Sequence, residues 1–298
     1  MFQHLRVPET SVHAVVLVDD GSFVVGGVNF LGHFEFPSTR MIASSTPNYS
    51  VEDMCLSKDK KKVFLATTKG FRSVLLSQLT QSDEYLTNES VFRIKRLDRI
   101  SRILFTYSDG EMALFDPDQK KVKKLHASHT DSIWAISTDP NESHMMTTGW
   151  DCKLIRWDLE DFTAEKSTRM HTQGVSLKVS SDFEVVLVGM LDKSICEYRI
   201  KDFMLNRILN HLHLDRFRSI STSSYGLLIT ASDDGTVKFP FTSLPEITVS
   251  TSPIMGTAMA SDAHMICACD KDGIHIVRLP ERSKVEELVS EKELARFA

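Results

Sequence analysis

Residues 128–161 read SHTDSIWAISTDPNESHMMTTGWDCKLIRWDLED. Two short β-prone runs in this stretch, SIWAIS and KLIRW, are separated by clusters of Asp, Asn, Ser and Gly. Apolar runs that alternate with turn residues predict antiparallel strands. Similar runs, such as AVVLV, RILFTY, EVVLVGM and IHIVRL, fill the rest of the chain, so the sequence predicts an all-β protein.

The tight turn GWDCKL in this stretch recurs in variant form along the chain, as GVNFLG, TTKGFR, YSDGEM, MLDKSI, SDDGTV and DKDGIH. The equivalent turn residues are Asn29, Lys69, Asp109, Asp151, Asp192, Asp234 and Asp272, with successive spacings of 40, 40, 42, 41, 42 and 38 residues. This spacing matches the period of a four-stranded propeller blade. Because a single sheet of this size leaves its faces exposed, such blades stack in a ring. We therefore predict one domain, residues 1–298, that forms a seven-bladed β-propeller of four-stranded antiparallel blades.

From His129 to its closing Trp157, the quoted stretch resembles a WD repeat. In that family a His, a Ser or Thr, an Asp and a Trp form a buried chain of hydrogen bonds; the matching residues here are His129, Thr147, Asp151 and Trp157. The resemblance implies that His129 and Asp151 are structural and do not form a catalytic dyad. Parts of the motif recur as His171 with Asp192 in the fifth repeat, and as His213, Thr230 and Asp234 in the sixth. The first two repeats depart furthest from the pattern.

The two ends of the chain carry separate predictions. Propellers of this family close when an N-terminal strand completes the last blade, and residues 2–7 suit that role before Pro8 interrupts the run. Residues 281–298, ERSKVEELVSEKELARFA, have helical spacing. Their apolar positions on one predicted face are Val285, Leu288, Val289 and Leu294. Three roles stay open for this tail: a cap on the propeller, the start of a partner-binding helix, or a terminus that frays or packs on the surface.

In WD-repeat propellers, peptides often bind over the mouth of the central channel. Two positions per blade are important there: one near the start of the first strand, and the residue before the turn Asp. Both are tryptophan in the fourth repeat, Trp134 and Trp150. The corresponding residues are Ser176 and Leu191 in the fifth repeat and Arg218 and Asp233 in the sixth. An aromatic pair could hold an Arg or Lys of a peptide between its rings; alternatively, Trp134 is a core residue and Trp150 packs on a neighbouring loop.

Composition narrows the range of partners. The net charge of −5 gives no global attraction to nucleic acid or to an anionic membrane. The five cysteines lack metal-site spacing, no apolar stretch approaches 18 residues, and there is no basic leader, so we expect an intracellular protein, cytoplasmic or nuclear, without membrane insertion, metal or cofactor. Residues 58–62 (KDKKK) and 120–124 (KKVKK) could form nucleic-acid or acidic-partner patches, but we interpret both as solvated turns.

These features favour a non-catalytic scaffold or adaptor that binds protein or peptide partners within a multiprotein complex. The main alternative is a nucleic-acid-associated propeller that uses its lysine-rich turns. Direct contact between this chain and nucleic acid is not what we expect. A propeller enzyme is less favoured, because His129, His171 and His213 recur at the blade period. Recurrence at this period indicates architecture, whereas catalysis needs unlike groups to converge at one place.

Overall fold

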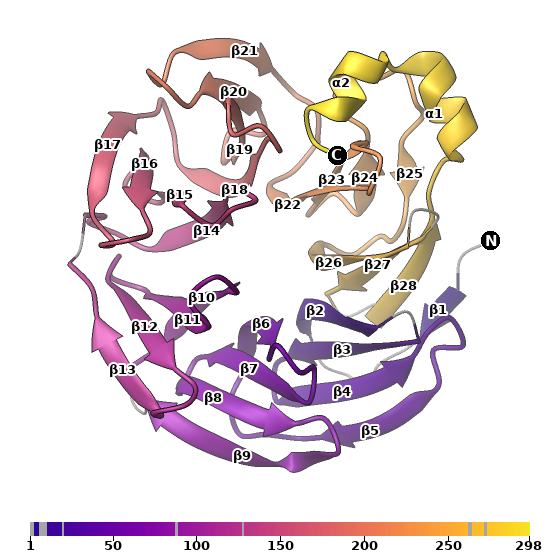
Figure 1. Cartoon of the computed structure of the whole chain (residues 1–298). Helices are drawn as coiled ribbons and strands as arrows, with labels where there is room; N and C mark the ends of the chain where they lie inside the picture. Colours follow the sequence, from indigo (N-terminus) through magenta and orange to yellow (C-terminus); the bar gives the residue numbers. More distant parts are fainter. Residues whose placement is uncertain are drawn as a thin grey trace.

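The computed structural model describes residues 3–5, 11–19, 21–86, 89–126, 128–261, 264–270 and 273–298. These residues form seven four-stranded antiparallel sheets, arranged as blades around a central axis (Figure 1). The predicted seven-bladed propeller is therefore confirmed. The predicted turn residue Asp272 lies outside the described residues.

Each of the first six blades is built from four consecutive strands, and the first strand of each lies nearest the axis (Figure 1). Blade 1 comprises β2 Val12–Asp19, β3 Ser22–Gly27, β4 Phe30–Glu35 and β5 Met41–Ser45. Blade 2 comprises β6 Val51–Leu56, β7 Lys62–Thr67, β8 Gly70–Leu75 and β9 Gln78–Leu86. Blade 3 comprises β10 Val91–Leu97, β11 Arg102–Tyr107, β12 Met112–Asp116 and β13 Lys121–Lys124. Blade 4 comprises β14 Ile133–Thr138, β15 His144–Gly149, β16 Lys153–Asp158 and β17 Ala164–Arg169. Blade 5 comprises β18 Gly174–Val179, β19 Val185–Met190, β20 Ile195–Arg199 and β21 Leu205–Leu209. Blade 6 comprises β22 Phe217–Thr222, β23 Leu228–Ser232, β24 Thr236–Lys238 and β25 Ile247–Thr248.

Blade 7 contains strands from both ends of the sequence. Its strands are β26 Ile254–Ser261, β27 His264–Cys269, β28 Gly273–Arg278 and β1 Gln3–Leu5, and β1 pairs antiparallel with β28. The predicted closure by an N-terminal strand is thus confirmed. Residues 2, 6 and 7 of the predicted run, and Pro8 after it, lie outside the described residues.

The hydrophobic core is divided among the junctions between blades. In the described part of the chain, seven apolar clusters are found, and each spans one pair of neighbouring blades. At the junction of blades 3 and 4, for example, Leu104 packs in one cluster with Ile155 and Trp157. Inner strands are consequently covered on both faces, which explains why β19 is apolar and buried throughout whereas the outer strand β21 is mostly exposed.

The turn between the second and third strands explains the recurring Asp. Its carboxylate Oδ1 accepts a hydrogen bond from the backbone N–H two residues later, at 2.9–3.0 Å, in the turns of Asp109, Asp151, Asp192 and Asp234. The residue after the Asp, and not the Asp itself, takes the left-handed conformation: Gly110, Cys152, Lys193 and Gly235. Blades 1 and 2 instead have two-residue hairpins, so Asn29 and Lys69 replace the Asp.

The C-terminal tail packs against the propeller as two short helices, α1 Arg282–Leu288 and α2 Glu291–Ala295. Val285, Val289 and Leu294 are buried, but Leu288 is exposed. The prediction that these four residues share one helical face was wrong, because α1 ends at Leu288 and Val289 is extended, with φ of −127°. Among the described residues no helix is long and apolar enough to cross a membrane.

One of the two lysine-rich runs is a strand. Residues 58–61 lie in the turn between β6 and β7, as predicted, but residues 121–124 form β13, the outermost strand of blade 3. The interpretation of the second run as a turn was therefore wrong. Only Val122 of this strand packs against a core cluster, so the exposed outer strand needs almost none of the apolar alternation that identifies inner strands.

Candidate functional site

A closed chain of hydrogen bonds fixes the entry to blade 4. His129 Nδ1 lies 3.0 Å from the carboxylate of Asp151, and its Nε2 lies 2.7 Å from Thr147 Oγ1. The indole N–H of Trp157 donates to the same hydroxyl at 2.8 Å. Every polar atom has a partner if His129 is neutral, donates from Nδ1 to Asp151, and accepts at Nε2 the proton of the Thr147 hydroxyl.

This chain of hydrogen bonds is sealed from solvent. The side chains of His129 and Asp151 are 0% and 3% exposed. Burial raises the pKa of the Asp151 carboxyl, but hydrogen bonds from His129 and from the backbone N–H groups of Thr130 and Lys153 outweigh this effect and lower the pKa overall. A dyad without access to solvent cannot reach a substrate, so this arrangement acts by holding the loop before β14 against the turn at Asp151.

Shorter versions of the motif occur in blades 5 and 6. His171 Nε2 lies 2.7 Å from Asp192, but both side chains are nearly half exposed. The strand register places Val188 where blade 4 has Thr147, so the chain of hydrogen bonds stops at the imidazole. In blade 6, His213 bonds to Asp234 at 3.0 Å and to Thr230 at 2.9 Å.

The predicted tryptophan pair lies at the mouth of the channel. The ring centroids of Trp134 and Trp150 are 5.8 Å apart with an interplanar angle of 35°. Trp150 is 38% exposed, whereas Trp134 is partly buried, packs edge-on against Phe92, and contacts the apolar cluster of blades 5 and 6. The pair thus combines a supported inner ring with an accessible outer one.

The predicted insertion of a cation between the two rings does not fit this geometry. A planar group between parallel rings needs a separation of about 7 Å, twice a van der Waals contact, and these rings already touch. In addition, the guanidinium of Arg93 lies 5.4 Å from the Trp134 ring, and its Nε donates to the Trp134 carbonyl at 2.7 Å. The chain therefore supplies its own cation to Trp134, and only the outer face of Trp150 is left for another molecule.

The channel beside this pair is a cavity of about 230 Å³. It is lined by residues from the first strand of every blade, including His13, Asp53, Arg93, Ser176 and Thr257. Burial lowers the pKa of Arg93 and raises that of Asp53, whose carboxylate accepts from the backbone N–H of Ile94 at 3.1 Å. The sequence analysis missed Arg93 and Asp53, because β10 (VFRIKRL) and β6 (VEDMCL) contain other charged residues and nothing in the sequence sets these two apart.

The other predicted mouth residues are largely satisfied within the chain. Arg218 forms a two-point hydrogen bond with Asp233, at 2.6 and 2.9 Å, and Arg216 approaches the same carboxylate at 3.2 Å. Leu191 is half-buried and packs against the apolar cluster between blades 5 and 6. Asp233 therefore offers little free charge to a partner, and Trp150 remains the accessible side chain of the predicted set.

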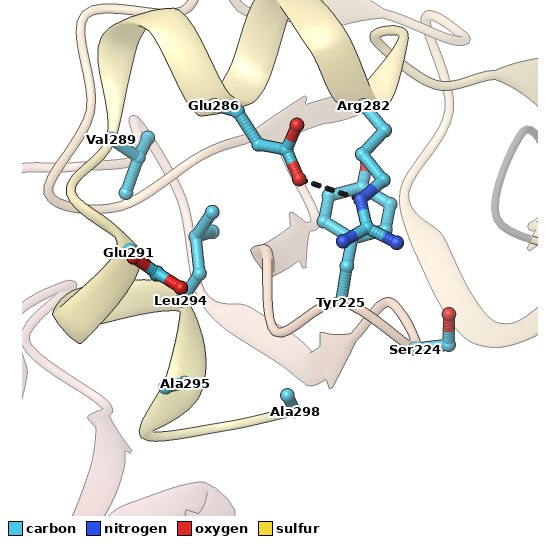
Figure 2. A pocket seen from close by; sticks show the side chains of 9 residues that line it. All are labelled: Ser224, Tyr225, Arg282, Glu286, Val289, Glu291, Leu294, Ala295 and Ala298. Carbon is cyan, nitrogen blue, oxygen red and sulfur yellow. Dashed lines mark hydrogen bonds and ion pairs between the residues drawn. The ribbon is translucent and has the colours of Figure 1, made fainter.

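A larger cavity of about 570 Å³ lies beneath the C-terminal tail. Figure 2 shows Val289 and Leu294 facing it from the tail, while Tyr225 lies below Arg282. The charges at its edge pair with each other, since Arg282 Nε donates to Glu286 at 2.6 Å. This cavity brings together no set of groups with an evident chemical function.

One cluster in the described part of the chain has metal-ligating atoms close together: His144, Asp158 and Glu165. Glu165 already accepts a hydrogen bond from Arg156 at 2.7 Å, and its carboxylate lies 3.7 Å from His144. An arginine within the cluster offsets the negative charge that would attract a cation. We therefore assign this group to the ion pairs on the surface of blade 4.

Comparisons with known proteins agree with this description. Residues 119–158 match the WD40 family model, described as WD domain, G-beta repeat. This segment is similar to a WD repeat. It runs from the outer strand of blade 3 through the first three strands of blade 4, so one repeat ties two blades together.

Among solved structures, the chain is similar to the WD40 β-propeller domain of Doa1, with a TM-score of 0.78 and 15% sequence identity over 95% of this chain and 97% of that one. At this identity the likeness shows the fold alone. No curated protein matches the sequence. The repeat and the fold together support the WD-repeat propeller family, whose members are typically protein-interaction scaffolds and generally non-catalytic.

Proposed function

We propose that this chain, as one propeller domain over residues 1–298, is a non-catalytic scaffold that binds a protein or peptide partner over the channel mouth within a multiprotein complex. The observation that carries the proposal is Trp150, a large aromatic side chain that is 38% exposed in a turn. Leaving such a ring in water is unfavourable unless a partner covers it. Trp134, which is itself held by Arg93, supports the ring of Trp150 before any partner arrives.

The chemistry of the mouth favours a partner with a basic or apolar side chain at the contact. The outer face of Trp150 is available for an Arg or Lys, an interaction of about 0.5–2 kcal/mol. A rigid aromatic residue beside a shallow channel is also typical of the few residues that contribute most of the binding energy in protein interfaces. The five cysteines, all within described residues, are free thiols, and we propose that the protein works in a reducing compartment, cytoplasmic or nuclear.

The experiment compares proteins captured by wild type and by Trp150→Ala, identified by mass spectrometry. We expect Trp150→Ala to keep its thermal midpoint and circular dichroism spectrum but to lose a specific subset of the partners. The matched control is Ile208→Ala, because Ile208 is 44% exposed on the outer strand β21, away from the channel.

For a partner lost in this comparison, the dissociation constant is then measured with purified components. Truncation of a central aromatic residue costs about 2 kcal/mol or more, so we expect a loss of about thirtyfold. Equal partner lists for wild type and Trp150→Ala would contradict the proposed site, as would identical losses in Ile208→Ala.

A further inference from the structure

Both lysine-rich runs meet at one cavity between blades 2 and 3. The cavity has a volume of about 400 Å³ and is lined by Lys58 and Lys62 from the first run and by Lys120 from the second. The two runs are some 60 positions apart in sequence. They come together because the turn between the first two strands of blade 2 and the turn between the last two strands of blade 3 lie at the same end of neighbouring blades. The cavity falls within the usual size range of small-ligand and side-chain pockets.

The floor of this cavity is apolar and rigid. It consists of Phe64, Ile103 and Phe115, which are buried in the core cluster of blades 2 and 3, together with the half-buried Tyr85. The ring centroids of Tyr85 and Phe115 are 4.4 Å apart, and those of Phe64 and Phe115 are 5.8 Å apart. Because Phe64, Ile103 and Phe115 are almost completely buried, an apolar side chain that entered the cavity would meet chiefly the ring of Tyr85, which Phe115 holds in place.

The rim combines charges that are already paired with two lysines that are not. Arg96 donates to the Leu56 carbonyl at 3.0 Å and to Asp98 at 2.9 Å. Lys62 lies 3.5 Å from Asp83. In contrast, the side chains of Lys58 and Lys120 are exposed and make no ion pair or hydrogen bond with any described residue.

The acidic residues of the rim matter for the identity of a ligand. Asp59 accepts from Ser57 Oγ at 2.6 Å and from the Lys61 backbone N–H at 3.1 Å, and Asp98 is engaged by Arg96. Asp118 also lines the cavity. Three carboxylates beside the basic groups oppose a continuous phosphate backbone. A ligand with a few separate negative charges suits this rim better than a nucleic acid does.

The cavity lies on the face opposite the tryptophan pair. It is bounded by the turns between first and second strands and between third and fourth strands, whereas Trp150 lies in a turn between second and third strands. Successive antiparallel strands reverse direction, so these two kinds of turn are at opposite ends of a blade. Both faces can therefore be occupied at the same time.

We propose that this cavity is a docking site for an acidic peptide segment of a partner protein that carries one aromatic or large apolar residue. The apolar side chain enters the cavity and packs on the half-buried Tyr85, above the buried Phe64 and Phe115, and flanking carboxylates pair with Lys58 and Lys120. This site is separate from the channel mouth and does not rest on the function proposed for Trp150.

The test measures binding of a fluorescein-labelled glutamate peptide with one central phenylalanine, by fluorescence anisotropy with the whole chain. We expect saturable binding, and weaker binding when alanine replaces the phenylalanine. Lys58→Glu combined with Lys120→Glu should weaken binding about tenfold, because each reversal replaces an attraction by a repulsion. Trp150→Ala should bind the peptide as wild type does.

The matched control combines Lys60→Glu with Lys123→Glu. It changes the same charge in the same two runs at exposed positions that do not line the cavity, and we expect less than about a threefold effect. Absence of saturable binding, or equal losses in the two double variants, would refute the docking site. Tighter binding of a single-stranded oligonucleotide at the same salt concentration would assign the lysines to nucleic acid and overturn the peptide proposal.

Discussion

Replacement of Thr147 by valine tests the structural role of the hydrogen-bonded chain in blade 4. Valine has nearly the same shape, and the register already places Val188 at the same position in blade 5, so the backbone tolerates it. The hydroxyl of Thr147 is the shared partner of His129 Nε2 and Trp157 Nε1, and all three side chains are buried. The substitution therefore leaves two buried polar atoms without a partner.

Each orphaned atom costs about 1–3 kcal/mol, so Thr147→Val should lower the free energy of unfolding by about 2–6 kcal/mol. For a chain of this size the thermal midpoint should fall by about 4–12 °C, measured by differential scanning calorimetry. Blade 6 supplies an internal comparison, since Thr230 bonds to His213 and to the backbone carbonyl of Lys238 but to no indole. Thr230→Val should therefore cost about half as much.

The strongest check is a double-mutant cycle with Trp157→Phe. Once the indole N–H is gone, Thr147→Val orphans only His129, so the double variant should be more stable than the sum of the single effects by about 1–3 kcal/mol. Additive effects within about 0.5 kcal/mol, or a thermal midpoint unchanged in Thr147→Val, would show that these contacts do not form one coupled unit.

Two further predictions concern pH and the tail. Burial lowers the pKa of His213 in the folded protein. As the pH drops below about 6.5, the His213 imidazole is therefore protonated more readily in the unfolded chain than in the folded one, and the free energy of unfolding falls. His213→Gln should flatten the fall in thermal midpoint between about pH 7 and about pH 5, whereas the exposed His126→Gln should leave the slope unchanged. Gly226 has φ of +87°, and a Cβ there would lie 1.7 Å from the Leu294 carbonyl. Gly226→Ala should loosen the tail and speed its cleavage by trypsin. Gly21→Ala should not, because a Cβ there would lie at an ordinary contact distance of 3.6 Å from Asp19 Oδ1; equal cleavage rates would count against this packing.

The sequence was sufficient to predict the architecture because the turns impose strict local demands. In these hairpins a carboxylate accepts a hydrogen bond from the backbone N–H two residues later, and the residue after the Asp is left-handed. These two demands restrict which residue types fit the turn. The resulting pattern, seen at Asp151 and Asp234, repeats at the blade period. The buried chain of hydrogen bonds was predictable for a related reason. Its members occupy fixed places in each repeat, so His129 and Thr147 could be identified by position.

The details of the channel mouth depend on contacts between blades, which no single repeat encodes. Arg93 belongs to blade 3 and lies over the ring of Trp134 in blade 4. The sequence of the fourth repeat therefore does not indicate that Trp134 already has a cation beside its ring. The exposure of Leu288 arose from a break between two helices, and such a break is hard to predict without a Gly or Pro. The strand β13 was not predicted because its lysine-rich sequence lacks apolar periodicity.

The pairing of β1 with β28 has a consequence for synthesis of the protein. Residues 3–5 leave the ribosome first but acquire their neighbours only after residues 273–278 have emerged. Until then the apolar surfaces where blades 1 and 7 meet, which include Phe23 and Ile266, are uncovered. A ring that has not closed exposes the apolar faces of blades 1 and 7 and is liable to associate with another nascent chain. We therefore expect chaperones to be most important before this last step of folding.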